Sequence, residues 1–561
     1  MARARRLFGL LIAIAIVSLL AGGGLSWLTR PHLPKQFVVE VILAGPLRET
    51  PGATSLGLLE IERLSLVEVC RGLRLAAHDG RVRGVMVRVS SVQTGWAAMR
   101  ELRRALEEVR RAGRPVIALL ETGGEKEYAV ATAADSLFLI PAGHVLLDGL
   151  AAQVGFWKGT MDKIGLEVDM VRVGEYKSAT ETYTRTSMSS EFRESIDALL
   201  DDLFGVYVSD LAIGRKLRPE LVRDRIDTGP YSANGALTAS LVDGLHYRAE
   251  IVEALGVSEK EVVGLDRYLD GVEKPRGTRM AYVVVEGGIT PGRSTDLPFS
   301  EPTAGSESVA EALREARDDE GLKGVLLRVN SPGGSALASD VIWDEVRRTV
   351  AVKPVVVSMG DVAASGGYYV AMPATRILAE ATTITGSIGV YAGKLVAEDL
   401  YDKVDYHVEV LTRGSRAALF SETRPFTEDE RVTLQQMLWD FYWNSFVAKA
   451  AQGRGLSPAH VDSVGRGRVW SGLRALSVGL VDTLGGIWEA QEALAALLEL
   501  PPGADITLVP VPRPKSLLTK VAEILLAEGA GTHMITRMSE SAGLPTEPGL
   551  FTRMPFRVTI E

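Results

Sequence analysis

Cysteine is nearly absent from this sequence, because Cys70 is the one cysteine among 561 residues. A disulfide within the chain and a cysteine-rich metal site are therefore excluded, while the redox compartment stays undetermined. The seven histidines form no pair at the spacing typical of metal ligands. A net charge of −9 argues against nucleic acid as a partner. We expect no metal, no cofactor and no nucleic acid.

Apolar runs long enough to cross a bilayer are also scarce, and the N-terminus holds the exception. Arginines within residues 3–6 precede the 22-residue apolar run 7–28, and about 20 residues are needed to span the hydrocarbon. The positive-inside bias puts the N-terminus in the cytoplasm and the chain after Arg30 outside. A cleaved signal peptide ending near residues 21–23 is the alternative. Both interpretations export the body of the chain, and we favour the uncleaved anchor because the apolar run continues past 23.

An internal repeat organises the rest of the chain. Three pairs of similar segments carry it: 84–91 and 324–331, 128–131 and 368–371, 241–243 and 480–482. The offset is 240 for the first two pairs and 239 for the third. An offset this steady indicates a duplicated domain, and a chain of 561 residues is too long for one core.

Each copy opens with an apolar strand, at 37–43 and 280–285, and then alternates helices with buried strands. In the second copy we expect a helix at 308–317, a strand at 325–329, a helix at 337–350, a strand at 355–358 and a helix from near 365. This alternation indicates βαβ units in an α/β fold with parallel pairing. We divide the chain into an anchor (1–30), an N-terminal repeat (31–275), a C-terminal repeat (276–500) and a proline-rich tail (501–561). An aromatic-rich helical pattern at 427–451 predicts core packing or a subunit contact.

The two copies differ where chemistry would be expected. The second has NSPGG at 330–334 after a strand, whereas the first has SSVQT at 90–94. Ser365 lies in a Gly- and Ala-rich turn, where the Gly366 N–H would be next to its hydroxyl. The first copy has Glu125 at the position of Ser365. The second copy alone therefore keeps a candidate nucleophile and its donors.

The first copy keeps a different group. Lys177, within 174–181, aligns with Arg416 of the second copy. A desolvated lysine can act as a base, whereas an arginine stays protonated. Complementary loss predicts one composite site formed between the two copies.

Four motifs resemble signal peptide peptidase A in its long, tandem-repeat form: EYKSATE (175–181), NSPGGS (330–335), AASGGYY (363–369) and TGSIGV (385–390). The resemblance runs from about residue 37 to 500, and it implies Ser365 as nucleophile, Lys177 as general base and Ser387 as the serine that orients the lysine. It also implies a crotonase- and ClpP-like superhelical fold, a membrane-anchored homotetramer and a bacterial inner-membrane location. Where family members often have proline, this chain has Thr182.

Our first hypothesis is an exported serine endopeptidase with a Ser-Lys dyad that cleaves remnant signal peptides and other apolar peptides. Gly366, with Gly333 or Gly334, would donate to the oxyanion. A neutral Lys177 requires burial away from carboxylates, so we expect Glu175 and Glu181 to face away after a turn at Gly174. The alternatives are a crotonase-like acyl-thioester enzyme and a catalytically idle scaffold that binds membrane proteins. A Ser-His-Asp triad using His407 is a further alternative that no flanking pattern supports.

Overall fold

The computed structural model describes residues 32–50, 52–56, 59–272, 277–296, 301–512, 551–553 and 559–560. The expected anchor at 7–28 and most of the tail lie outside these ranges. Within them, no helix is both long enough and apolar enough to cross a membrane.

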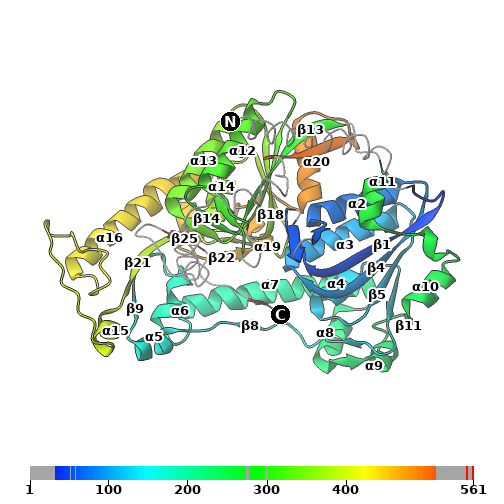
Figure 1. Ribbon diagram of the computed structural model, residues 1–561, viewed down its shortest axis with the longest axis horizontal. Helices are drawn as coiled ribbons and strands as arrows, with labels where there is room; N and C mark the ends of the chain where they lie inside the picture. Colours follow the sequence, from blue (N-terminus) through cyan, green and yellow to red (C-terminus); the bar gives the residue numbers. More distant parts are fainter. Residues whose placement is uncertain are drawn as a thin grey trace, which may run out of the picture.

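Two sheets with the same strand order form the core of the molecule (Figure 1). The first has the order β11 (Gly244–Leu245), β6 (Ser136–Leu139), β5 (Val116–Leu120), β4 (Val82–Gln93), β1 (Phe37–Pro46), β12 (Val262–Gly264). The second has the order β23 (Thr483–Leu484), β19 (Arg376–Ala379), β18 (Val355–Ala364), β16 (Val325–Ser331), β13 (Thr278–Glu286), β24 (Ile506–Pro510). All these pairs are parallel. The tandem α/β organisation is therefore confirmed, and β24, the counterpart of β12, lies beyond the expected boundary at 500.

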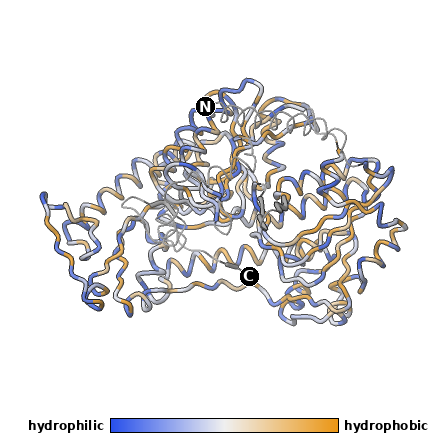
Figure 2. The backbone as a smooth tube through the Cα atoms, viewed as in Figure 1, coloured by the Kyte–Doolittle hydropathy of each residue, from blue (hydrophilic) through white to orange (hydrophobic). Residues whose placement is uncertain are grey.

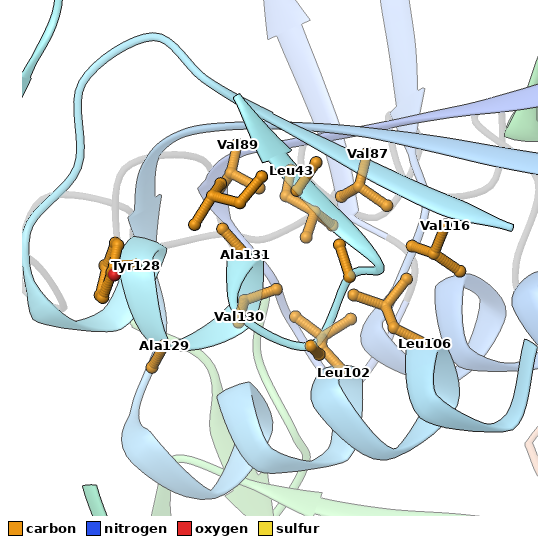
Figure 3. Close-up of a cluster of buried hydrophobic side chains, with 14 of the residues drawn as sticks. Leu43, Val87, Val89, Leu102, Leu106, Val116, Tyr128, Ala129, Val130 and Ala131 are labelled. Carbon is orange, nitrogen blue, oxygen red and sulfur yellow. The ribbon is translucent and has the colours of Figure 1, made fainter. Parts of the chain in front are cut away.

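Helices cover the sheets because the strands are β-branched and apolar on both faces. Those of the first repeat are α2 (Leu66–His78), α3 (Trp96–Arg111), α4 (Glu125–Ala131), α5 (Lys158–Ile164), α6 (Glu181–Thr184), α7 (Ser190–Arg215), α8 (Pro219–Thr228), α9 (Ala233–Thr238), α10 (Arg248–Ala254) and α11 (Leu265–Gly271). Figure 2 shows that hydrophobic residues are concentrated along the strands. Figure 3 shows Val87 and Val116 of the sheet facing Leu102 and Leu106 of α3, all of them buried.

The second repeat has the helices α12 (Ser306–Asp318), α13 (Ala336–Val350), α14 (Gly366–Ala371), α15 (Glu398–Lys403), α16 (Glu428–Asp440), α17 (Ala448–Arg454), α18 (Pro458–Val464), α19 (Gly472–Ser477) and α20 (Ile487–Leu497). The expected elements between 308 and 365 are present as α12, β16, α13, β18 and α14. A π-helical segment, η3 (Phe441–Val447), joins α16 to α17. Tyr442 and Phe446 on η3 are fully buried, while Trp439 and Trp443 are exposed and stacked.

A further sheet joins the repeats. Its order is β15 (Thr303–Gly305), β14 (Gly288–Thr290), β17 (Gly333–Ser335), β25 (Phe551–Arg553), β21 (Val390–Val396), β9 (Glu167–Val173). β9 belongs to the first repeat, yet it pairs antiparallel with β21 of the second along its whole length, from Val173↔Val390 to Glu167↔Val396. This pairing carries the chain after β9 into the second repeat. Two further strands belong to the sheet of the second repeat: β20 (Ile384–Gly386) pairs parallel with β18, and β22 (Val469–Ser471) pairs antiparallel with β20. The remaining strands are β2 (Gly52–Leu56), β3 (Leu59–Arg63), β7 (His144–Val145), β8 (Ala152–Gln153), β10 (Tyr231–Ser232) and β26 (Thr559–Ile560).

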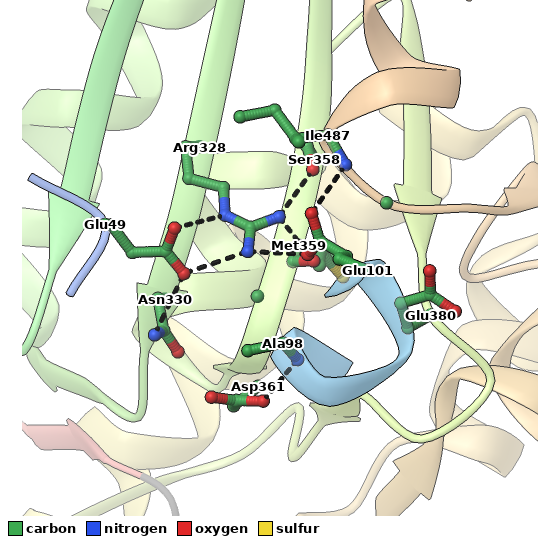
Figure 4. A network of polar contacts seen from close by, with 12 residues as sticks. Glu49, Ala98, Glu101, Arg328, Asn330, Ser358, Met359, Asp361, Glu380 and Ile487 are labelled. Carbon is green, nitrogen blue, oxygen red and sulfur yellow. Dashed lines mark hydrogen bonds and ion pairs between the residues drawn. The ribbon is translucent and has the colours of Figure 1, made fainter. Parts of the chain in front are cut away.

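A buried charge cluster also joins the repeats (Figure 4). Arg328 of β16 is fully buried and contacts Glu49, which follows β1, at 2.9 Å and Glu101 of α3 at 2.7 Å. Burial raises the pKa of the Glu101 carboxyl to about 7 in spite of the guanidinium. Asp361 of β18 caps α3, because its carboxylate accepts from the N–H groups of Gly95 (2.9 Å) and Ala98 (3.0 Å). The first repeat is thus tied to the two strands that lead into the candidate site.

Candidate active site

Ser365 lies in a strained turn between β18 and α14. Its φ is 56° and its ψ −113°, a conformation that costs a non-glycine residue about 1–3 kcal/mol. Its N–H donates to the carbonyl of Gly386 at 2.8 Å, so it is engaged with the neighbouring strand β20. The strand–turn–helix context is the one in which other hydrolases expose a nucleophilic serine. Ser365 is fully buried beneath the surrounding chain.

Lys177 reaches Ser365 from the first repeat. After β9 the chain turns at Gly174, whose φ is 101° and whose added Cβ would lie 2.2 Å from the carbonyl oxygen of Arg466. The turn directs the lysine toward Ser387, and its Nζ lies 2.7 Å from Ser365 Oγ. The structure therefore brings together two residues that are 188 positions apart in the sequence.

Ser387 completes the surroundings of the amine. Parallel pairing of β18 and β20 sets Ala364 beside Gly386, so Ser365 and Ser387 both follow directly after a paired residue. Nζ lies 3.0 Å from both the carbonyl oxygen and Oγ of Ser387. In a neutral amine the two N–H groups can donate to these oxygens, which leaves the lone pair for the Ser365 hydroxyl. Burial lowers the pKa of the Lys177 amine well below its ordinary value.

Two carboxylates close in sequence to Lys177 face away from it, as expected. Glu175 pairs with Arg466 at 3.4 Å. Glu181 is buried and accepts from Arg172 at 2.9 Å and from the Ser189 N–H at 2.9 Å. Arg172 also donates to the Lys177 carbonyl at 3.0 Å. Glu181 and Arg172 thus hold the lysine turn against the start of α7 without adding a charge at the amine.

The backbone N–H groups expected to donate to the oxyanion differ in whether they already have an acceptor. Gly366 is the first residue of α14, where helical N–H groups have no acceptor within the helix. The Gly333 N–H donates to Ser331 Oγ at 3.2 Å, so it is engaged within its own loop. Gly333 and Gly334 lie on β17, whose backbone pairs with β25.

Asn330 ties this loop to the nucleophile strand and to the first repeat. Its Oδ1 accepts from the Val362 N–H at 3.1 Å, and its amide donates to Glu49 at 3.2 Å. Val362 precedes Ser365 by three residues. Asn330 of the NSPGGS motif therefore links this loop to the nucleophile strand and to the first repeat, a role that the motif alone did not reveal.

The positions equivalent to the dyad, and the rival histidine, lie elsewhere. Glu125 is buried and accepts from the N–H groups of Asp148 and Gly149. Arg416 pairs with Asp429 on the surface. His407 is 78% exposed and pairs with Asp405. Within the described ranges, no group of three or more His, Cys, Asp or Glu side chains could hold a metal ion.

Comparisons with known proteins identify the family of this chain. The profile of Peptidase family S49 matches twice, at residues 108–262 and 347–501. The chain is 33% identical to the chloroplastic serine protease SPPA of Arabidopsis thaliana, with 82% of this chain and 69% of that protein aligned. It is 31% identical to Protease 4 of Salmonella typhi, over 78% of this chain and 73% of that one. The solved structure of a ClpP1 variant from Listeria monocytogenes has a TM-score of 0.25 at 14% identity over 37% of this chain and 94% of that one, a likeness too distant to establish a shared fold.

The protein is therefore a serine protease that carries two copies of a peptidase domain. It belongs to peptidase family S49.

Proposed function

We propose that the protein is an endopeptidase in which Ser365 is the nucleophile and Lys177 its general base. The observation that carries this proposal is the 2.7 Å distance between Lys177 Nζ and Ser365 Oγ in a fully buried setting. A serine hydroxyl needs an adjacent base to attack a carbonyl at neutral pH. A lysine without a paired carboxylate, held in a desolvated site, is suited to that task.

The reaction would follow from these contacts. Neutral Lys177 takes the Ser365 proton as Oγ attacks a peptide carbonyl, and it then passes that proton to the leaving amine. The same amine next activates a water that hydrolyses the acyl-enzyme. The Gly366 N–H, with Gly334 or with Gly333 once its N–H is released from Ser331 Oγ, would stabilise the oxyanion, and each such donor is worth about 3–4 kcal/mol. Ser387 would keep the lone pair of Nζ aimed at Oγ.

An extended peptide suits the space beside this site. β25 lies between β17 and β21 and pairs antiparallel with both, with Gly333↔Arg553 and Tyr391↔Phe551 among the partners. The two flanking strands can therefore bind a peptide backbone by strand addition. We propose that substrates bind in this position, and that they are remnant signal peptides and other apolar stretches.

The dyad is tested by turnover of an apolar peptide and by labelling with a fluorophosphonate probe. Ser365→Ala and Lys177→Ala should each abolish turnover, and Ser365→Ala should also abolish labelling. Ser195→Ala, which removes a buried hydroxyl without a hydrogen-bond partner, and Arg416→Ala are the matched controls and should stay active. Labelling that persists in Ser365→Ala would contradict the proposal. A wild-type protein that is neither labelled nor active would favour the idle scaffold. Hydrolysis of acyl-thioesters without peptide cleavage would favour the crotonase-like alternative.

We further propose that the protein is anchored in the bacterial inner membrane by residues 7–28, with its body outside the cytoplasm. The arginine-led apolar run supports this topology. Export would also keep the body away from cytoplasmic coenzyme A, which speaks against the crotonase-like alternative. A reporter fused after Glu561 should be active only outside the cytoplasm. Cytoplasmic activity of that reporter would overturn the proposal.

We also propose that the chain assembles with copies of itself, as a homotetramer. In the offset that aligns Lys177 with Arg416, β9 corresponds to residues 406–412, which are exposed and carry Leu411 at 91% exposure. At the offset of 240 that relates the earlier pairs of segments, the counterpart of β21 in the first repeat is 150–156, which includes β8. Because β9 pairs with β21 within one chain, 406–412 of one copy is suited to pair with 150–156 of another. Sedimentation should show a tetramer for the wild type and smaller species for a Val408→Lys, Val410→Lys double variant, and a monomeric wild type would refute the proposal.

A further inference from the structure

The loop between α18 and β22, residues 465–468, lies against the turns that carry Lys177 and Ser387. The N–H of Tyr176 donates to the carbonyl of Arg466 at 3.0 Å. The N–H of Gly467 donates to the carbonyl of Ile388 at 2.7 Å, and the N–H of Ser387 donates to the carbonyl of Arg468 at 2.7 Å. The 465–468 loop therefore connects the turn that carries Lys177 with the turn that carries Ser387.

Gly467 is packed directly on Lys177. A Cβ added at Gly467 would lie 2.4 Å from the Lys177 nitrogen, 2.5 Å from its Cα and 2.6 Å from its Cβ. On the other side, a Cβ added at Gly389 would lie 3.0 Å from Gly467 Cα and 3.2 Å from Lys177 Cδ. A displacement of the loop would therefore displace the main chain of the lysine and its aliphatic stem.

The loop has a conformation that needs support. Arg466 has a φ of 50° and Gly467 a φ of 84°, and the left-handed region costs a non-glycine residue about 1–2 kcal/mol. Tyr442 supplies the support from η3. Its hydroxyl accepts from the Arg466 N–H at 3.2 Å and donates to Asp462 at 2.7 Å, while the Arg466 guanidinium contacts the same carboxylate at 2.8 Å.

We propose that Tyr442 is a positioning residue for the dyad, one that acts through the 465–468 loop to fix Lys177 and Ser387 relative to Ser365. This inference rests on the proposed function. Tyr442 is fully buried and its hydroxyl bonds to the loop rather than to the amine. The charged groups that face the loop are Asp462, Glu175 and Arg466, and burial is the cause that lowers the pKa of Lys177. Loss of the brace would admit water to the amine and raise that pKa toward its ordinary value.

The test is Tyr442→Phe, which removes only the hydroxyl. We expect kcat to fall about tenfold with little change in KM, since a small displacement of a reacting group is costly. We also expect the acid limb of the kcat/KM profile to move to higher pH. Tyr128→Phe is the matched control, because that buried hydroxyl donates to the Leu241 carbonyl at 2.7 Å in the first repeat. It should leave kcat and the limb unchanged, whatever it does to Tm.

A second pair of variants tests the contact itself. Gly467→Ala and Gly455→Ala both add a methyl at a positive φ, 84° and 64°, but at Gly455 nothing lies within 4 Å of it. Gly467→Ala should lower kcat about a hundredfold and Gly455→Ala should not.

An unchanged kcat and acid limb in Tyr442→Phe would overturn the inference, even if its Tm fell as in Tyr128→Phe. Failure of the proposed function would look different, because Ser365→Ala would then retain turnover.

Discussion

Replacing Arg328 by methionine should destabilise the protein far more than the same change at Arg88, its equivalent at the offset of 240. Arg328 is fully buried and holds Glu49 and Glu101 at 2.7–2.9 Å. Removing one partner of a buried ion pair costs about 3–5 kcal/mol, because the remaining charges stay desolvated. Arg88 is 29% exposed and contacts Glu121 at 2.7 Å, and such a pair is worth about 0–1 kcal/mol.

The penalty at Arg328 should also depend on pH. Without the guanidinium, which lowers it, burial would hold the folded-state pKa of the Glu101 carboxyl still further above its unfolded value near 4.3. The folded state then binds more protons than the unfolded state, so stability falls as pH rises through that window. In the wild type the pKa of Glu101 is already about 7. The difference between Arg328→Met and wild type should therefore be larger at pH 8 than at pH 5.

Urea unfolding followed by tryptophan fluorescence at pH 5 and pH 8 measures the loss of stability in each variant. We expect Arg328→Met to lower the midpoint clearly at pH 5 and further at pH 8, and Arg88→Met to shift it little at either. Equal shifts for the two variants, or a penalty at Arg328 that shrinks with rising pH, would refute the reasoning.

Three other predictions concern the site and its supports. Lys177→Met should have a higher Tm than wild type at pH 7, and this gain in Tm should shrink as pH approaches about 10.4. The reason is that the folded-state pKa of Lys177 is lowered, so wild-type stability rises with pH up to the unfolded pKa of about 10.4. A gain in Tm that is constant with pH would contradict this. Gly334→Ala should lower kcat/KM at least about tenfold, since its Cβ would lie 2.0 Å from a main-chain oxygen of β14, whereas Gly288→Ala, with nothing within 4 Å, should not; equal activity of the two would count against the role of this loop. Asp361→Ala should cost about 0.5–2 kcal/mol in urea unfolding through loss of the α3 cap, and an unchanged midpoint would argue against that contact.

Much of the fold could be predicted from the sequence because duplication repeats the same local patterns. The segments 84–91 and 324–331 became β4 and β16 at equivalent places in their sheets. The complementary loss at Glu125 and Arg416 predicted that Ser365 and Lys177 meet, and their contact is what the structure has. Comparison of two copies supplies long-range information that hydrophobic periodicity alone lacks.

Other features have no local signal. The pairing of β9 with β21 crosses between repeats, and a single strand pattern does not name its partner. Burial of Arg328 depends on carboxylates 227 and 279 positions away, and neither position stands out in its own segment. The residues that brace Lys177, Arg172 and Tyr442 among them, act through hydroxyl and main-chain contacts that only the folded chain brings together.

The most direct test of the dyad is the pH dependence of Ser365 phosphonylation by a fluorophosphonate, measured for wild type and Lys177→Arg. A general base must be unprotonated, so the wild-type rate should rise along a limb whose apparent pKa lies well below 10.4. Lys177→Arg should react as slowly as Lys177→Ala, because it keeps the charge and loses the base. Rapid labelling of Lys177→Arg, or a wild-type limb near 10.4, would contradict a Ser365–Lys177 dyad.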